Sequence, residues 1–232
     1  MKIVTPIIIA LLITVGILTL SGQANRIGIT VGQNSFINFQ INYQLVLLGF
    51  ALFSMISSYV LNPESFKSFL SFGNISAKGE ELKIFGIKKG DSWLKTGISL
   101  SIFISLVTAL FMFFQLKGQN IDYGILKKGL FWVIIFSLTN SFSEEIIYRI
   151  GINGPLANRL SPNKIFIISA VIFGFAHFNG MPNGVIGIIL AGLLGYVLSK
   201  SVQETNGIFW AWMIHFLQDL IIIGSLYLLS SI

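Results

Sequence analysis

Long apolar runs separated by short polar segments make up most of the chain. A helix needs about 20 such residues to cross a bilayer, and four of the runs reach roughly that length. Three more follow, and the first two of these need neighbouring turns or helices to complete a span. The expected membrane helices cover residues 3–20, 43–61, 94–116, 129–150, 165–178, 184–198 and 208–229. The pattern therefore predicts an all-α, polytopic bundle of about seven transmembrane helices.

Two polar features modify this pattern. Lys2 precedes the first run, as in a secretory signal, but the run is too long for a signal core and lacks a convincing small-x-small cleavage site after it. We therefore expect a retained first helix. The connection 62–93 contains five lysines and four acidic residues, and we expect a loop or an interfacial helix there rather than a separate domain.

Basic residues are distributed unevenly between the two sides of such a bundle. With the N-terminus inside, most of them fall in or beside cytoplasmic segments, whereas Arg26, Lys117, Lys127 and Lys128 do not. Cytoplasmic segments carry an excess of Lys and Arg, so the bias predicts an N-in, C-out orientation, although the residues near Lys127 oppose it. Attraction to anionic lipid accounts for the net charge of +6. We see no nucleic-acid-binding pattern and expect no such partner.

Composition supports the membrane assignment and narrows the chemistry. Hydrophobic residues make up 54% of the chain and charged residues only 10%, with a mean hydropathy of +0.82. These values indicate an integral membrane protein. The chain has no cysteine, which excludes disulfides, thiolate nucleophiles and cysteine-ligated metals. A catalytic group in this chain must therefore use oxygen or imidazole.

The fourth apolar run contains the densest group of ionisable residues. Glu145 and Arg149 are four residues apart and share a helix face, so we expect an ion pair that lowers the cost of burying both charges. Glu144 points about 100° away from Glu145 and is left without that partner. A carboxylate projecting into a cavity suits a general acid or base. The alternative is that both glutamates mark the polar end of the span.

Two later runs also carry ionisable groups, although each costs about 2.5–3.5 kcal/mol at the centre of a bilayer. Phe173 and His177 share one helix face, and so do His215 and Asp219. We expect Glu144, His177, His215 and Asp219 to converge on one polar intramembrane site. A small-residue series in the sixth run would allow close helix packing beside it: Gly187, Ala191 and Gly195.

Together these motifs resemble those of the CPBP family, which contains type II CAAX prenyl endopeptidases and bacteriocin-processing or Abi membrane proteins. The motifs are Glu144-Glu145-x-x-x-Arg149, Phe173-x-x-x-His177 and His215-x-x-x-Asp219, in that order. The resemblance covers residues 125–232, which we interpret as the catalytic core. Residues 1–124 would then form the N-terminal helices and cytoplasmic loop of the same membrane domain.

The resemblance implies an intramembrane endopeptidase in which Glu144 and His177 activate water. Glu145, Arg149 and Phe173 would support them, and His215 and Asp219 would stabilise the oxyanion or hold a metal. Two alternatives are equal here. Either Glu144, His177 and His215 bind a divalent ion such as zinc, or the mechanism is metal-free.

This chain departs from the family pattern at two positions. The last motif often ends in Asn, but Asp219 as a carboxylate only accepts hydrogen bonds. This suits orienting His215 or binding a metal better than a direct oxyanion contact. The family commonly has Gly directly after the motif arginine, whereas here Ile150 comes before Gly151.

Three functions compete at this point. The first is a protease of the bacterial plasma membrane that acts on a membrane-associated, prenylated or leader-type peptide, with membrane lipid as its other partner. The second is a non-catalytic scaffold or bacteriocin self-immunity protein. The third is a proton-coupled transporter, which the lack of a recognisable inverted repeat disfavours.

Overall fold

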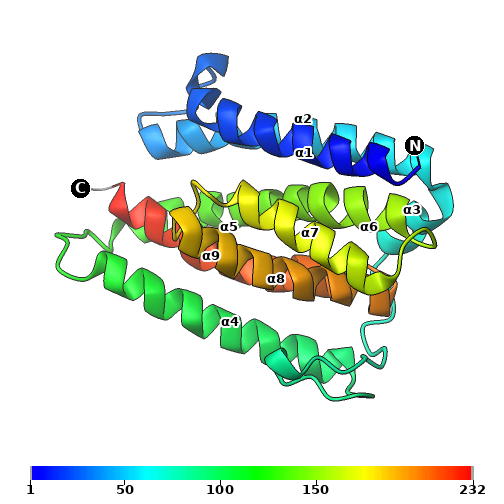
Figure 1. Ribbon diagram of the computed structural model, residues 1–232. Coiled ribbons are helices and arrows are strands. Elements are labelled where there is room, and N and C mark those ends of the chain that lie inside the picture. Colours follow the sequence, from blue (N-terminus) through cyan, green and yellow to red (C-terminus); the bar gives the residue numbers. More distant parts are fainter. Residues whose placement is uncertain (1, 231–232) are drawn as a thin grey trace.

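The computed structural model describes residues 2–230, which form a bundle of α-helices without a β-strand in that range. Figure 1 shows the helices running roughly along one common direction. Their bounds are α1 Val4–Leu20, α2 Ser35–Leu61, α3 Pro63–Phe69, α4 Trp93–Leu116, α5 Ile125–Glu145, α6 Gly151–Leu156, α7 Pro162–Ala176, α8 Gly184–Thr205 and α9 Phe209–Leu229. Two 3₁₀ turns, η1 Ser21–Ile27 and η2 Lys83–Phe85, and the π-helical turn η3 Ile146–Ile150 complete the described elements.

Seven apolar helices correspond to the seven predicted spans. Five are long and apolar enough to cross a membrane: α2, α4, α5 continuing through α6, α8 and α9. α1 and α7 are apolar but shorter, at 17 and 15 residues. The predicted all-α membrane bundle is therefore confirmed.

Several predicted helix boundaries were wrong. α2 begins at Ser35 rather than at residue 43, because polar residues in its first turns are buried inside the bundle instead of marking a loop. Asn34 caps this helix by accepting a hydrogen bond from the Ile37 amide at 3.0 Å. The fourth span does not end at residue 150, since the helix continues through α6, and α8 extends to Thr205.

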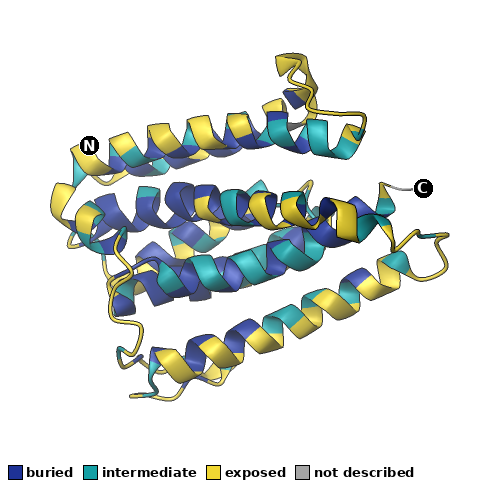
Figure 2. Ribbon diagram, turned by 180° about the vertical axis from the view of Figure 1, so that it is seen from behind, coloured by how far each residue is buried: buried dark blue, intermediate teal, exposed yellow. Residues whose placement is uncertain are grey.

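The helices form layers around a buried centre (Figure 1). α5, α7, α8 and α9 occupy the middle, with α1 and α2 on one side and α4 on the other, where it packs against α9. Buried residues concentrate in the middle helices, whereas the outer faces of α1, α2 and α4 are exposed (Figure 2). These exposed faces are strongly apolar, as Leu12, Val60 and Phe103 show at 65%, 71% and 64% exposure. Such faces fit contact with lipid rather than with water.

Glycines set the close approach of α7 and α8. A Cβ atom on Gly195 would lie 3.0 Å from the Phe173 ring, and one on Gly174 would lie 2.6 Å from the carbonyl oxygen of Ile188. A Cβ atom on Gly187 would likewise lie 2.1 Å from the carbonyl oxygen of Pro182 and 2.9 Å from that of His177, both in the connection between the two helices. The predicted role of the small-residue series in helix packing is thus present, and it brings the end of α7 against α8.

The connection between α2 and α4 closes one end of the bundle. It contains α3 and η2, and the Asn74 amide donates to the Thr205 carbonyl at the end of α8 at 2.7 Å. The Trp93 indole donates to Glu204 Oε2 at 2.8 Å, and the Trp210 indole donates to the Ile75 carbonyl at 2.9 Å. Glu204 also forms an ion pair with the buried Lys200.

The N-terminus, this connection, the α6–α7 turn and the α8–α9 turn all lie at the same end of the bundle (Figure 1). The segments predicted to be cytoplasmic are therefore on one side. Which side of the membrane they face stays a prediction, and labelling of single cysteines introduced into this cysteine-free chain would test it.

Candidate active site

A π-helical turn directly follows Glu144 and Glu145, at the end of α5. α5 ends at Glu145, the turn η3 follows, and α6 continues to Leu156. Wider turns of this kind insert an extra residue and leave a backbone carbonyl to be satisfied elsewhere, frequently at functional sites. Here Ser58 of α2 donates to the Ile150 carbonyl at 2.8 Å. Gly151 lets α2 approach, since a Cβ there would lie 2.2 Å from Ser54 Oγ.

Glu145 and Arg149 form the ion pair that their spacing predicts. Arg149 Nε lies 3.0 Å from Glu145 Oε2, and both side chains are fully buried. Arg149 Nη1 also donates to Ser169 Oγ at 2.9 Å, and its guanidinium lies 4.3 Å from the centre of the Phe173 ring. Pairing and hydrogen bonding of this kind are what make a buried charge tolerable.

Glu145 has a second partner that sequence reasoning missed. Its Oε1 lies 2.9 Å from Nδ1 of His215 on α9. Because a carboxylate only accepts, Nδ1 carries the proton and donates it, so Nε2 faces the rest of the site. This Nε2 lies 3.8 Å from Glu144 Oε2 and 3.7 Å from Asp219 Oδ1. Arg149, Glu145 and His215 thus form one chain that fixes the imidazole.

Glu144 presents one free carboxylate oxygen to two imidazoles. Its Oε1 accepts a hydrogen bond from Asn140, whereas the buried Oε2 accepts none from the described residues. Oε2 lies 3.7 Å from His177 Nε2 and 3.8 Å from His215 Nε2. These distances are too long for direct hydrogen bonds and suit a bridging water.

His177 directly follows α7, and Phe173 fixes its orientation. His177 Nδ1 lies 2.9 Å from the Phe173 carbonyl oxygen, which must accept, so Nδ1 carries a proton. In the neutral ring Nε2 then presents a lone pair toward Glu144. The Phe173 ring also lies 4.3 Å from the His177 ring and 5.7 Å from the His215 ring.

Asn140 and Gln44 are further site residues that sequence reasoning missed. The Asn140 amide nitrogen donates to Glu144 Oε1 and to Asp219 Oδ2, both at 3.1 Å. Gln44 of α2 donates to the Asn140 amide oxygen at 3.4 Å and accepts from Thr139. The available signals were that Asn140 precedes Glu144 by one helical turn and that Gln44 is polar within an apolar run.

The predicted site residues therefore come together, but the cavity beside them is mostly apolar rather than polar. It has a volume of about 340 Å³ and lies between α4, α8 and α9. His177, His215, Gln218 and Asp219 form a polar wall, and Thr108 is the other polar side chain lining it. Phenylalanines of α4, aliphatic residues of α8 and Phe85 of η2 supply most of the remaining surface.

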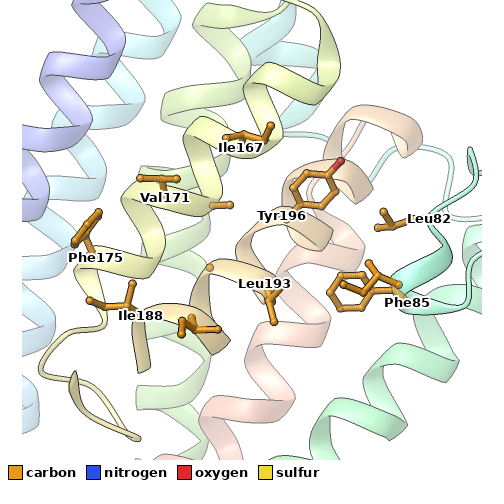
Figure 3. A pocket seen from close by; sticks show the side chains of 12 residues that line it. Leu82, Phe85, Ile167, Val171, Phe175, Ile188, Leu193 and Tyr196 are labelled. Atoms are coloured by element: carbon orange, nitrogen blue, oxygen red, sulfur yellow. The ribbon is translucent and has the colours of Figure 1, made fainter. Parts of the chain in front are cut away.

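A second cavity, of about 410 Å³, lies between α7, α8 and η2 (Figure 3). Its lining is apolar apart from the Tyr196 hydroxyl, and none of the residues that line it is His, Asp or Glu. Phe85 and Leu193 line both cavities. The second cavity offers an apolar surface on the outer side of α7 and α8 but no catalytic group.

The geometry gives no support to the predicted metal site. Within residues 2–230, no group of three His, Asp or Glu side chains is arranged so that it could hold a metal ion. Glu144, His177 and His215 have suitable donor atoms. Among the described residues, however, they are not arranged as a three-ligand set.

Comparison with known proteins agrees with the motifs. Residues 126–221 match the family model described as type II CAAX prenyl endopeptidase Rce1-like. The match extends from α5 into α9 and includes Glu144, His177, His215 and Asp219. Among curated proteins and among solved structures, none matches this chain. The family match agrees with the resemblance over residues 126–221, and the apolar helices indicate an integral membrane protein.

Proposed function

Since residues 126–221 match the type II CAAX prenyl endopeptidases, we propose that this chain is an intramembrane endopeptidase whose water nucleophile is activated by Glu144 and His177. One observation carries the proposal. The buried Glu144 Oε2 has no hydrogen-bond partner among the described residues, and two imidazole nitrogens face it at 3.7 and 3.8 Å. A water held there would contact a carboxylate that can take up its proton, as general-base catalysis requires, and an imidazole that can orient it.

The reaction proceeds through a tetrahedral intermediate. Glu144 accepts a proton from the water while His177 Nε2 helps to orient it, and the resulting hydroxide adds to the peptide carbonyl carbon. The carbonyl oxygen becomes an oxyanion. When the C–N bond breaks, Glu144 returns its proton to the leaving amine, so that the products are a carboxylic acid and an amine.

His215 lies where it can stabilise the oxyanion. The chain of Arg149 and Glu145 fixes its Nδ1, His215 lines the cavity, and its Nε2 lies 3.8 Å from Glu144 Oε2. When both ring nitrogens carry protons, Nε2–H can donate to the developing negative charge. A donor held in advance by buried partners stabilises a transition state without a reorganisation cost.

The cavity favours an apolar substrate. Its walls from α4 and α8 are phenylalanine-rich and aliphatic, so they suit hydrophobic side chains or a lipid group next to the scissile bond. We propose a membrane-associated peptide, prenylated near its carboxyl end, as the substrate, and the bacterial plasma membrane with the N-terminus inside as the location.

The test is cleavage by purified wild-type protein in liposomes. Peptides ending in Cys-aliphatic-aliphatic-x are offered with and without a prenyl group on the cysteine, in ¹⁸O-labelled water, and the products are analysed by mass spectrometry. We expect cleavage of the prenylated peptide with one ¹⁸O atom in the new carboxylate, unaffected by a chelator. Absence of cleavage of both peptides would contradict the proposed activity, and loss with EDTA restored by zinc would contradict the metal-free mechanism.

A further inference from the structure

Asp219 is already used as a hydrogen-bond acceptor. Its Oδ2 accepts from Asn140 at 3.1 Å, and its Oδ1 lies 3.7 Å from His215 Nε2. A carboxylate in these contacts has no proton to donate to an oxyanion. Asp219, which ends the third motif, therefore orients other groups. It does not supply a second oxyanion donor beside His215.

Gln218, the residue before Asp219, has the missing donor. Its side chain is buried, at 8% exposure, and lines the catalytic cavity together with His215. His215 and Gln218 are three residues apart on α9 and therefore share a face of the helix. The Gln218 Nε2 group is buried and has no hydrogen-bond partner among the described residues. A buried amide left without a partner is costly, which is a reason to expect that a ligand satisfies it.

Other buried donors do not fit this role. Ser143 Oγ and Trp212 Nε1 also lack partners among the described residues, but neither residue lines the cavity. The Asn140 amide nitrogen already donates to Glu144 and Asp219. Gln218 thus combines an unsatisfied amide with a place on the polar wall of the cavity.

We propose that Gln218 is a catalytic residue whose Nε2–H₂ group donates a hydrogen bond to the oxyanion, beside His215. The inference rests on the proposed peptidase function and names a residue that the three motifs do not include. Asp219 then positions Asn140 and His215, while Gln218 supplies the amide donor from the neighbouring position of the same helix.

The experiment compares kinetics of Gln218→Met and Gln218→Glu with wild type in liposomes. Both changes keep the side-chain length and remove the N–H donor. Loss of one oxyanion donor lowers kcat by about 10²–10³-fold, and we expect KM to stay within a few-fold. Affinity for a phosphinic peptide, a tetrahedral analogue of the cleaved sequence, should fall with kcat. Gln40→Met is the matched control, because Gln40 is also buried with an unpartnered side-chain oxygen but lies outside the cavity.

The outcomes separate this inference from the proposed function. If wild-type protein cleaves no peptide, the proposed peptidase function is wrong, and the inference about Gln218 is wrong with it. If wild type cleaves and Gln218→Met keeps kcat within about threefold, Gln218 is not an oxyanion donor. Equal losses of folded yield, substrate affinity and kcat in both variants would also overturn the inference, since they indicate a structural role. A selective loss of kcat and of phosphinic-peptide affinity supports it.

Discussion

Several residues of this site act in pairs, and the sequence predicts only some of these pairs. The four-residue spacing of Glu145 and Arg149 predicts their ion pair, and the structure contains it. The hydrogen bond from His215 to Glu145 joins residues 70 positions apart. No local pattern could predict it, because the packing of α9 against α5 decides which carboxylate faces the imidazole.

The ion pair predicts a stability effect at Arg149. Arg149→Ala would leave the fully buried Glu145 carboxylate with one partner fewer, and breaking a buried pair in this way typically costs about 3–5 kcal/mol. We expect a lower folded yield, a lower thermal midpoint and reduced cleavage. Arg26→Ala, at an exposed arginine, should change none of these. Wild-type yield and activity in Arg149→Ala would show that the pair does not support the site.

At the scale of elements, the apolar pattern predicts the helices better than their ends. The first turns of α2 escaped prediction because their polar residues are satisfied inside the bundle, as when Asn42 bonds to the backbone of Ile29. The continuation into α6 escaped prediction because Gly151 and Pro155 favour a helix end locally, while packing against α2 keeps the segment helical. In both cases, tertiary contacts override the local conformational preference.

The packing of α7 on α8 gives a prediction at this scale. In Gly174→Ala the new Cβ would lie 2.6 Å from the Ile188 carbonyl oxygen, so the helices must separate. Overpacking typically costs about 1–3 kcal/mol. Because His177 directly follows α7, cleavage should fall together with the thermal midpoint. Gly192→Ala is the matched control, as its Cβ would meet only the Ala170 carbonyl oxygen at 3.4 Å. Equal behaviour of the two variants would contradict this packing account.

At the scale of the whole molecule, the sequence predicts the membrane bundle and the main polar residues but not how the layers contribute to the site. α2 supplies Gln44 beneath Asn140, and α4 forms one wall of the cavity. Both helices lie within residues 1–124, which the motifs alone separate from the catalytic core. The sequence of an apolar helix face does not reveal whether that face contacts lipid or another helix, because both offer similarly apolar surroundings.

In the proposed mechanism, the free oxygen of Glu144 activates water in a buried site. Glu144→Gln keeps the side-chain shape but cannot take up a proton. Cleavage of the prenylated peptide in liposomes should therefore fall by about 10²–10⁴-fold, while membrane insertion and thermal midpoint stay near wild type. Glu81→Gln, at an exposed glutamate, is the control and should cleave normally. If Glu144→Gln cleaves at the wild-type rate, Glu144 is not the base and the account is wrong.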